Sequence, residues 1–492
     1  MKQELEKFYI TTTLPYVNSN PHIGFAMEII RADVVARYKR FRGYDVFFNT
    51  GTDEHGAKIY ENALKVNIST QDYVDNYAKK FHDQLKALNI SDIVFTRTTD
   101  ESHKKAAQEM WKRCYANGDI YKKYYKIKYC VGCELEKTDS ELTEDKCEIH
   151  PTRDIEIREE ENYFFRWSKY QKPLLDFYQT HANFVIPDFR FNEIKAFVER
   201  GLDDFSISRL KEKMPWGVVV PKGSCDEGDE EKQVMYVWFD ALTSYISCLG
   251  WGGDEKNFSY WKEGSPVQYC GKDNLRQQSA MWQAMLMSAG INNSSHIIIN
   301  GFIMSGGQKM SKSIGNVISP FDVIDTFKDL TNFPEDVLRF VLLHDISTFE
   351  DGDVTMESIK ASYTAHLANG IGNLTSRIMK MATVNDVSIV SVEVQSENED
   401  IIKAMNEFDI RKAITCCMQA VKKLDQKIQE TEPFKVIKVD KEKGSHLILE
   451  MLLDLSSIAT QLSLFMPRTS EKILECIREN KMPEKPLFNR LA

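Results

Sequence analysis

The sequence predicts an α/β fold in which a doubly wound parallel sheet carries a Cys/His insertion and is followed by a helical bundle. Three observations point to this fold. An apolar, β-branched run at residues 8–13 leads through a turn into a helical pattern. Two cysteine and histidine pairs interrupt the middle of the chain. Long amphipathic segments dominate from residue 365 onward, which indicates a bundle.

The first predicted strand ends at Pro15, and apolar residues recur at helical spacing over residues 27–41. His22 and Gly24 are therefore expected at a helix amino terminus, beyond the carboxyl end of a strand, where doubly wound sheets bind ligands. Backbone N–H groups and the helix dipole favour an anion there, and His22 can donate a hydrogen bond to a phosphate oxygen. A turn that binds no ligand is the alternative interpretation.

A glycine-rich loop, GGQKMSKS at residues 306–313, is a second candidate for phosphate binding. It follows an apolar run at residues 296–304 that is predicted to form one strand. The two glycines permit a mobile loop, so Lys309 and Lys312 can close on a polyphosphate. A lysine pair alone is also typical of a solvated surface.

Asp53 follows a predicted parallel strand at residues 45–50, within the sequence GTDEHG. A carboxylate at the carboxyl end of that strand can pair with the fixed ammonium charge of an amino acid. A helix amino-terminal cap is the alternative role for Asp53. Amphipathic helices at residues 71–88 and 99–118 complete the first half of the sheet domain.

Three cysteines and a histidine form two short pairs that are separated by thirteen residues: Cys130 with Cys133, and Cys147 with His150. Two such knuckles supply four nitrogen and sulfur ligands for tetrahedral Zn²⁺. Four protein ligands leave no coordination position open for water. We therefore expect one structural zinc ion per chain.

After a polar, acidic loop at residues 224–232, the chain is expected to return to the sheet. Trp238, Ala241 and Tyr245 then recur on one helical face. An aromatic stripe at this spacing is common in an ordinary core and also suits a ligand pocket.

The remaining elements are a further strand, a linker helix and the bundle. Residues 268–273 predict the strand, with Gly271 and Asp273 at its mouth, and residues 334–343 predict the helix. The bundle is expected to contain single helices at residues 367–381, 401–430, 447–465 and 469–479.

Composition narrows the class of protein. The chain has 492 residues, enough for about three or four modules, and its 42% hydrophobic and 28% charged residues are typical of a soluble globular protein. No charge-free apolar run is long enough to span a membrane, and no targeting segment is evident, so a cytoplasmic protein is expected. The net charge of −10 argues against general nucleic-acid binding, although a local basic face can still contact phosphates.

Together, the P-H-I-G turn and the intact KMSKS pentapeptide resemble the two nucleotide motifs of class I aminoacyl-tRNA synthetases. The GTDEHG, YVWFDA and GKD segments and the cysteine pairs narrow the resemblance to the methionyl-tRNA synthetase family, over nearly the whole chain. This resemblance implies a Rossmann-like catalytic fold in two halves, 1–118 and 223–305, around a zinc-knuckle connective insertion at 119–222. It also implies a linker with the KMSKS loop and stem contacts at 306–364, and a helical anticodon-binding domain at 365–492.

The resemblance implies three sets of site residues. Those for ATP are Thr13, His22, Gly24, Gly271, Asp273, Ile303, Lys309, Met310, Ser311, Lys312 and Ser313, among which His22, Lys309 and Lys312 are the catalytic ones. Those for methionine are Leu14, Tyr16, Asp53, Trp238, Ala241, Tyr245 and Gln278, and polarizable aromatic walls suit the sulfur of a thioether. Those for the anticodon are Asn373, Arg377 and Phe434, because base-edge hydrogen bonds and stacking suit the splayed bases of an RNA loop.

Three residues, Phe25, Gln278 and Phe434, depart from the family pattern. Phe25 stands where the family has a second phosphate-binding histidine, which leaves His22, backbone N–H groups and the lysines to bind phosphate. Gln278 replaces a pocket histidine and can still form a hydrogen bond. Phe434 replaces the anticodon-stacking tryptophan with a smaller ring.

The activity that this resemblance implies is that of a methionine–tRNA ligase. It would use ATP with Mg²⁺, L-methionine and the initiator and elongator methionine tRNAs, and it would work as a monomer away from membranes. A class I synthetase for another apolar amino acid is one alternative, although about 100 residues of insertion, partly a zinc knuckle, leave little room for an editing domain. A non-catalytic zinc-knuckle RNA-binding paralogue is another, and the intact KMSKS loop, His22, Asp53 and Asp273 argue against it.

Overall fold

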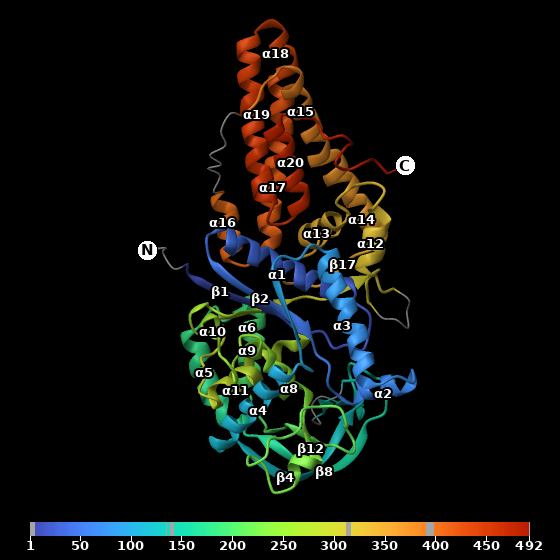
Figure 1. Ribbon diagram of the computed structural model, residues 1–492, viewed down its shortest axis with the longest axis vertical. Coiled ribbons are helices and arrows are strands. Elements are labelled where there is room, and N and C mark those ends of the chain that lie inside the picture. The colour runs from blue at the N-terminus through green and yellow to red at the C-terminus, as the bar shows by residue number, and fades with distance from the viewer. Residues whose placement is uncertain (1–4, 134, 138–141, 311–315, 390–397, 492) are drawn as a thin grey trace.

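The computed structural model describes residues 5–133, 135–137, 142–310, 316–389 and 398–491. Its elements form three layers along the long axis of the molecule (Figure 1). A helical bundle built from the carboxyl-terminal part of the chain lies at one end, a parallel sheet lies in the middle, and the inserted module lies at the other end. The predicted α/β architecture with an insertion and a carboxyl-terminal bundle is confirmed. Within the described residues, no helix combines the length and apolar character that crossing a bilayer requires.

The central sheet has six strands, and every neighbouring pair in it is parallel. In spatial order they are β3 (Ile93–Arg97), β2 (Asp45–Thr52), β1 (Lys7–Thr12), β13 (Val267–Gly271), β14 (His296–Asn300) and β9 (Val185–Ile186). The chain runs outward from β1 through β2 to β3, and later outward from β13 to β14. The strand order therefore reverses between β1 and β13, which is where open α/β sheets bind ligands.

Alternate residues of the central strands enter two different cores, as the period of a β-strand requires. Phe8 and Ile10 of β1 pack with α1 (Ile23–Phe41) and with α13 (Pro334–His344), in a core that continues into the bundle. Tyr9 of β1 points to the opposite face, in a core with α4 (Glu101–Ala116), α9 (Ser244–Ser247) and α11 (Trp282–Ser288). The remaining helices of this region are α2 (Ala57–Lys65), α3 (Thr70–Ala87), α8 (Val237–Leu242), α10 (Ser259–Glu263) and α12 (Pro320–Phe327).

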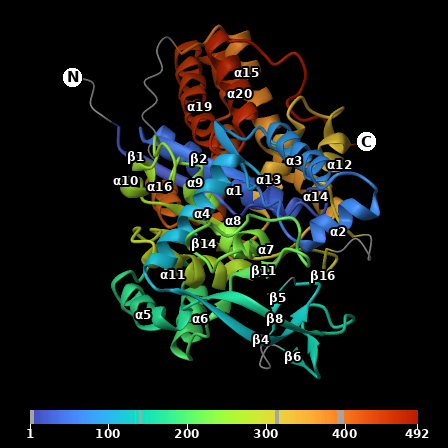
Figure 2. The same ribbon diagram turned by 60° about the horizontal axis from the view of Figure 1, so that its bottom comes forward.

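The insertion is built on a long antiparallel pair, β4 (Ile120–Cys130) and β8 (Glu156–Phe165). Figure 2 shows this pair below the sheet, with the knuckle at its end. Its other elements are β5 (Leu135–Glu136), β6 (Leu142–Thr143), β7 (Lys146–Cys147), α5 (Gln171–Thr180), α6 (Asp188–Glu199), β10 (Phe205–Ser206), β11 (Ser208–Leu210), α7 (Asp229–Lys232) and β12 (Gln233–Met235).

The bundle packs its apolar helix faces together, as the amphipathic pattern predicts. It follows α14 (Met356–Ser362) and a π-helical segment, Tyr363–Gly372. Its helices are α15 (Asn373–Val384), α16 (Glu399–Asn406), α17 (Ile410–Thr431), α18 (Pro433–Val439), α19 (Lys441–Leu462) and α20 (Pro467–Glu479).

Several predicted elements are divided in the structure. The strand predicted at residues 296–304 is wrong as a single element: β14 ends at Asn300, and β15 (Ile303–Ser305) joins β16 (Gln308–Lys309) and β17 (Gly352–Asp353) in another sheet. Gly301 lies between β14 and β15, where the chain packs against the Glu350 backbone. A Cβ on residue 301 would lie 2.2 Å from the Glu350 carbonyl carbon, so the close approach requires glycine.

Two predicted bundle helices are also interrupted. The segment at 401–430 divides into α16 and α17, because Phe408 adopts a left-handed φ of 57° and Asp409 caps α17 by accepting from the Lys412 N–H. The segment at 367–381 has a kink at Gly370, whose φ and ψ are −91° and −111°. The loop predicted at residues 224–232 ends in α7, and α12 and α18 were not predicted.

Candidate active site

A cavity of about 310 Å³ opens at the point where the strand order reverses. Five parts of the chain form its walls. The segment after β1 contributes Thr13, Leu14, Pro15, Tyr16 and Asn18, and the segment after β2 contributes Asp53 and Lys58. After β12, α8 contributes Val237, Trp238, Ala241 and Leu242, and α9 contributes Tyr245. The end of β13 is followed by Asp273 and Asn274, and the knuckle contributes Gly132 and Cys133.

Asp53 is fixed beside Tyr16 by backbone pairing. The Asp53 N–H donates to the Pro15 carbonyl at 3.0 Å, and the Val17 N–H donates to the Asp53 carbonyl at 3.1 Å. Both side chains line the cavity, as predicted. The alternative of a helix cap is excluded, because the residue that caps α2 is Gly56.

His22 is the amino-terminal cap of α1, at the helix start where the sequence predicts it. Its Nδ1 accepts a hydrogen bond from the Gly24 N–H at 3.1 Å, so in the neutral ring the N–H is on Nε2. Gly24 allows this contact, because a Cβ there would lie 2.9 Å from the His22 Cε1.

Among the predicted ATP residues that the structure describes, Thr13 and Asp273 line this cavity. The lining of the cavity does not include His22, Gly24, Gly271, Ile303 or Met310. The side chain of Lys309 and residues Ser311, Lys312 and Ser313 lie outside the part of the chain that the structure describes.

Phe25, the first residue that departs from the family pattern, packs against α3. Its ring meets Phe81 of α3 edge-on, with centroids 5.3 Å apart and planes at 89°. A ring in this place stabilises the contact between α1 and α3 and offers no hydrogen bond to a ligand.

Glu28 is a site residue that sequence reasoning missed. Its Oε1 accepts from the Thr13 N–H at 2.9 Å and so ties α1 to the cavity wall. Burial, with a smaller effect of the Asp273 charge, raises the pKa of Glu28 to about 8. The signal in the sequence is a single acidic residue within the apolar run at residues 23–30, beside Met27.

The aromatic wall is supported by a buried amide pair. Gln278 donates from its amide to the Tyr245 hydroxyl oxygen and accepts from the Gln268 amide at 2.7 Å. Gln278 and Gln268 are fully buried, and Gln278 does not line the cavity. Burial also raises the pKa of the Tyr245 phenol, which stays neutral at ordinary pH. Gln278 thus reaches the cavity through Tyr245.

Asp240 holds the helix that carries Trp238 and Ala241, and it too was missed. One carboxylate oxygen lies 2.6 Å from His55 Nδ1 and the other lies 2.8 Å from His103 Nε2, with all three residues buried. Burial favours the neutral acid, but the two imidazoles hold the pKa of Asp240 below its usual range. A single acidic residue within the apolar run VWFDAL is the signal for this cluster.

The predicted zinc ligands come together. The Cys133 Sγ lies 3.4 Å from Cys147 Sγ and 3.2 Å from His150 Nδ1, and all four ligand atoms lie within 4.8 Å of one another. Zn–S and Zn–N bonds of about 2.0–2.3 Å in a tetrahedron need ligand separations of roughly 3.3–3.8 Å. Three thiols and one imidazole at these spacings fit a structural zinc ion. Because Gly132 and Cys133 also line the cavity, the knuckle forms one of its walls.

A second candidate site lies in the bundle, in a groove of about 380 Å³ between α15, α17 and α18. Arg377 and Phe434 share this groove, and the Phe434 side chain is 42% exposed. The Arg377 guanidinium forms an ion pair with Asp425 of α17. Asn373 is exposed at the start of α15 and does not line the groove. Lys380 and Lys438, which sequence reasoning missed, add positive charge to it.

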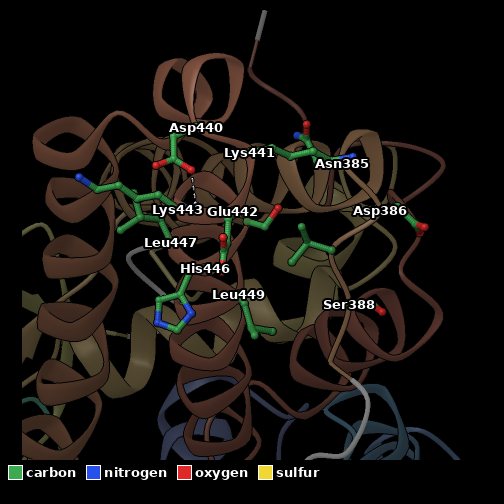
Figure 3. A pocket seen from close by; sticks show the side chains of 12 residues that line it. Asn385, Asp386, Ser388, Asp440, Lys441, Glu442, Lys443, His446, Leu447 and Leu449 are labelled. Carbon is green, nitrogen blue, oxygen red and sulfur yellow. Dashed lines mark hydrogen bonds between the residues drawn. The ribbon is translucent and has the colours of Figure 1, made fainter.

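A larger cavity of about 940 Å³ lies between the end of α15 and the start of α19 (Figure 3). Asp440 caps α19 there by accepting from the Lys443 N–H at 3.0 Å. Among the residues that line this cavity in the described part of the chain, none is a predicted site residue.

Comparison with known proteins agrees with this geometry. The family model for tRNA synthetases class I (M) matches residues 8–141 and 132–379. A methionine–tRNA ligase of Thermotoga maritima is 43% identical over 378 residues, which are 76% of this chain and 58% of the relative. One of Brucella suis is 36% identical over 490 residues, 96% of this chain and 92% of the relative. The chain belongs to the methionyl-tRNA synthetase family.

Solved members of the methionyl-tRNA synthetase family have the same architecture. The Mycobacterium tuberculosis methionyl-tRNA synthetase in complex with methionyl-adenylate matches with a TM-score of 0.85 and 30% identity, over 99% of this chain and 98% of that chain. This confirms the predicted resemblance and the Rossmann-like class I fold. The chain is therefore a ligase of the aminoacyl-tRNA synthetase class, and the non-catalytic paralogue and the synthetase for another amino acid are not favoured.

Proposed function

We propose that this methionyl-tRNA synthetase family member joins L-methionine to methionine tRNA in two steps. Methionine and ATP first form methionyl-adenylate and pyrophosphate, and the methionyl group then passes to the 3′ end of the tRNA. The observation that carries the proposal is the cavity at the sheet's switch point. It brings Asp53, the wall of Trp238, Ala241 and Tyr245, and Asp273 to one volume of about 310 Å³.

The walls of the cavity suit the parts of a methionyl-adenylate. Asp53 would pair with the methionine ammonium group. Trp238, Ala241, Tyr245 and Tyr16 would surround the thioether, with Leu14 adding backbone contacts. Asp273 would accept from the ribose hydroxyls, with Gly271 giving the ribose room at the end of β13, and the backbone near Ile303 would contact the adenine.

Adenylate formation needs no protein nucleophile, because the methionine carboxylate attacks the α-phosphate in line. The chain's part is to position the two reactants and to stabilise the charge on the phosphates. We assign the phosphates to His22 through its Nε2–H, to the backbone N–H groups at the start of α1 near Gly24, and to the loop from Lys309 to Ser313. Mg²⁺ enters with ATP as part of the substrate.

The groove of Arg377 and Phe434 is the proposed anticodon site, with Asn373 at its approach. An arginine and an exposed aromatic ring, flanked by Lys380 and Lys438, suit a base that has left its stack. Initiator and elongator methionine tRNAs are the proposed partners of this site. The zinc ion has a structural role, in the knuckle that borders the cavity.

Methionine-dependent ATP–pyrophosphate exchange tests the proposal most directly. We expect exchange with methionine and at most trace exchange with leucine, valine or cysteine, followed by charging of methionine tRNA. Exchange that depends on another amino acid would overturn the assignment of methionine as the substrate. If none of the four amino acids supported exchange, the proposed ligase activity itself would be overturned. The matched control is the Asp53→Asn protein, which keeps the shape of the side chain and loses its charge.

A further inference from the structure

The buried amides behind the aromatic wall belong to a longer series of hydrogen bonds. Gln268 of β13, Gln278, Gln283 of α11 and Ser294, which precedes β14, form this amide relay, and all four side chains are buried. Among the described residues that line the cavity, none belongs to the relay. Polar side chains in a core are costly unless each one is satisfied, whereas apolar side chains fill the same space without that requirement. The reaction proposed so far gives Gln268, Gln283 and Ser294 no role that explains their presence.

The direction of the relay is set at one end by backbone groups, whose donor and acceptor roles are fixed. The Ser294 N–H donates to the Gln283 Oε1 at 3.1 Å, and the Gln283 Nε2 donates to the Gln278 backbone carbonyl at 2.9 Å. Only one orientation of the Gln283 amide satisfies both contacts. The same Nε2 also donates to the Ser294 hydroxyl oxygen at 3.1 Å, so the Ser294 O–H is turned towards another acceptor.

From Ser294 the same direction passes through two glutamines to Tyr245. The Ser294 hydroxyl donates to the Gln268 Oε1, and the Gln268 Nε2 donates to the Gln278 Oε1 at 2.7 Å. The Gln278 Nε2 then faces Tyr245 and donates to its hydroxyl oxygen. In the described part of the chain, the Ser294 hydroxyl has the Gln268 oxygen as its one acceptor. Reversing the two glutamines would therefore leave a buried hydroxyl hydrogen unsatisfied, which is costly.

Tyr245 accepts the last of these hydrogen bonds and keeps its own O–H. Burial raises the pKa of this phenol, so the proton stays on the oxygen. No described residue accepts a hydrogen bond from this hydroxyl, and Tyr245 is only 3% exposed, so bulk solvent does not serve as the acceptor. A buried hydroxyl hydrogen needs an acceptor, and Tyr245 lines the cavity. A ligand in the cavity is the acceptor that remains.

We propose that Gln268 and Ser294, held by Gln283, are positioning residues that make this site selective for a thioether, an inference that rests on the proposed function. They fix the Gln278 amide with its N–H towards Tyr245, so the Tyr245 O–H donates to the methionine sulfur, a weak acceptor. With the relay reversed, Tyr245 would donate to Gln278 and turn its oxygen lone pairs towards the sulfur. The relay thus favours methionine over L-norleucine, in which a methylene group replaces the sulfur and accepts no hydrogen bond.

The test compares two substitutions in the relay with the same substitutions outside it. Gln268→Met is matched by Gln84→Met, because Gln84 of α3 is also fully buried and its amide has no hydrogen-bond partner in the described part of the chain. Ser294→Ala is matched by Ser279→Ala, because Ser279 is fully buried and no described residue bonds to its hydroxyl.

Methionine-dependent ATP–pyrophosphate exchange gives kcat and the KM for methionine with each protein, and norleucine is added as a competitor to obtain its Ki. Selectivity is the ratio of the norleucine Ki to the methionine KM. Thermal unfolding verifies that each variant is folded.

We expect Gln268→Met to lower the selectivity by about threefold or more, because a hydrogen bond to the sulfur is lost and norleucine makes none. The change should lie in the KM for methionine, with kcat within about twofold of wild type, since the reacting bond is at the phosphate. Ser294→Ala should lower the selectivity by about twofold or more, because it removes the donor that orients Gln268. Both controls should keep the selectivity of the wild-type chain.

A smaller fall in selectivity with either relay variant would overturn the proposal, and if one of them does not fold, the other decides alone. An equal fall in the matched control would also overturn it. So would a parallel rise in the methionine KM and the norleucine Ki, because that pattern describes a damaged pocket. If the wild-type chain itself shows no methionine-dependent exchange, the proposed function has failed, which the wild-type measurement reports separately.

Discussion

Asp53 has the most specific proposed role among the predicted residues, that of binding the methionine ammonium group. Its backbone is paired on both sides with residues 15–17, so the carboxylate is held in place before substrate arrives. Asp53→Asn should therefore raise the KM for methionine by about tenfold or more and change the KM for ATP little, because a charge-assisted contact to the ammonium group is lost. Steady-state exchange kinetics measure both constants. Asp83→Asn, an exposed change on α3, is the control, and equal increases in both KM values would refute the role.

Arg377 separates the chemistry of the two sites. Arg377→Ala should leave ATP–pyrophosphate exchange nearly unchanged, because that reaction lies in the sheet layer, and should lower charging of methionine tRNA by about tenfold. With a tRNA whose anticodon is already altered, the loss should nearly vanish. The same proportional loss on both tRNAs would make Arg377 a phosphate contact without base readout. Lys403→Ala, on α16, serves as the matched loss of charge.

Glu28 predicts a dependence of stability on pH. Its pKa of about 8 in the folded protein exceeds the 4.5 of the free side chain, so between these values the folded state holds a proton that the unfolded state has lost. This contribution to stability is complete at acidic pH and is lost as pH rises from about 4.5 to 8. Chemical denaturation of Glu28→Gln should show a flatter profile over this window. An unchanged slope would mean that the carboxyl is ionised when folded.

At the level of elements, the amino-terminal strand, turn and helix could be predicted because each has a strong local signal. The interruptions within predicted strands and helices could not be predicted, because contacts between residues far apart in the chain cause them. Gly301 interrupts the apolar run at residues 296–304 because the backbone of Glu350 and Asp351 packs against it. The division between α16 and α17 depends on Asp409, which also accepts a hydrogen bond from Thr348 at 3.0 Å.

The same reasoning separates the site residues that were predicted from those that were missed. Asp53, Trp238 and Tyr245 follow strands or belong to family motifs, and motif spacing identifies them. Glu28 and His103 lie outside these motifs, and His55 and Asp240 lie within the GTDEHG and YVWFDA segments without any spacing that would indicate a contact between them. Their roles arise from packing of α1, α4 and α8 against segments that are distant in sequence.

The knuckle is an element whose stability and function should be linked. We expect one zinc ion per chain, and we expect Cys133→Ser to lose it, to lower the melting temperature and to raise the KM for methionine or ATP, because the neighbouring residues form a wall of the cavity. Metal analysis and exchange kinetics check this together. Cys225→Ser, at a half-buried cysteine outside the cluster, is the control and should retain the metal. Less than half an equivalent of zinc in the wild-type protein would contradict the site.

Across the whole molecule, a buried ion pair joins the sheet layer to the bundle. Arg339 of α13 lies 2.8 Å from Asp33 of α1 and also donates to the Phe465 carbonyl after α19 at 2.8 Å, with both charged side chains fully buried. Arg339→Leu leaves Asp33 without this partner and should destabilise the protein by about 3–5 kcal/mol. Denaturant unfolding measures the change. Lys472→Leu, in a partly exposed pair with Glu475, should cost less than about 1 kcal/mol, and similar costs for both would refute the bridging role.

The central pair of the sheet, β1 with β13, also determines when the protein can fold during synthesis. Thr13 and Tyr269, which meet at the ends of these strands, are 256 positions apart in the chain. At ordinary rates of translation, β1 waits on the order of tens of seconds for β13 to leave the ribosome. The antiparallel insertion pairs within itself and can form during this interval, whereas the middle of the sheet closes only when the second half of the catalytic fold emerges. The nascent chain thus carries an exposed apolar strand throughout the synthesis of its insertion, and its amino-terminal half is the part that most needs chaperone protection.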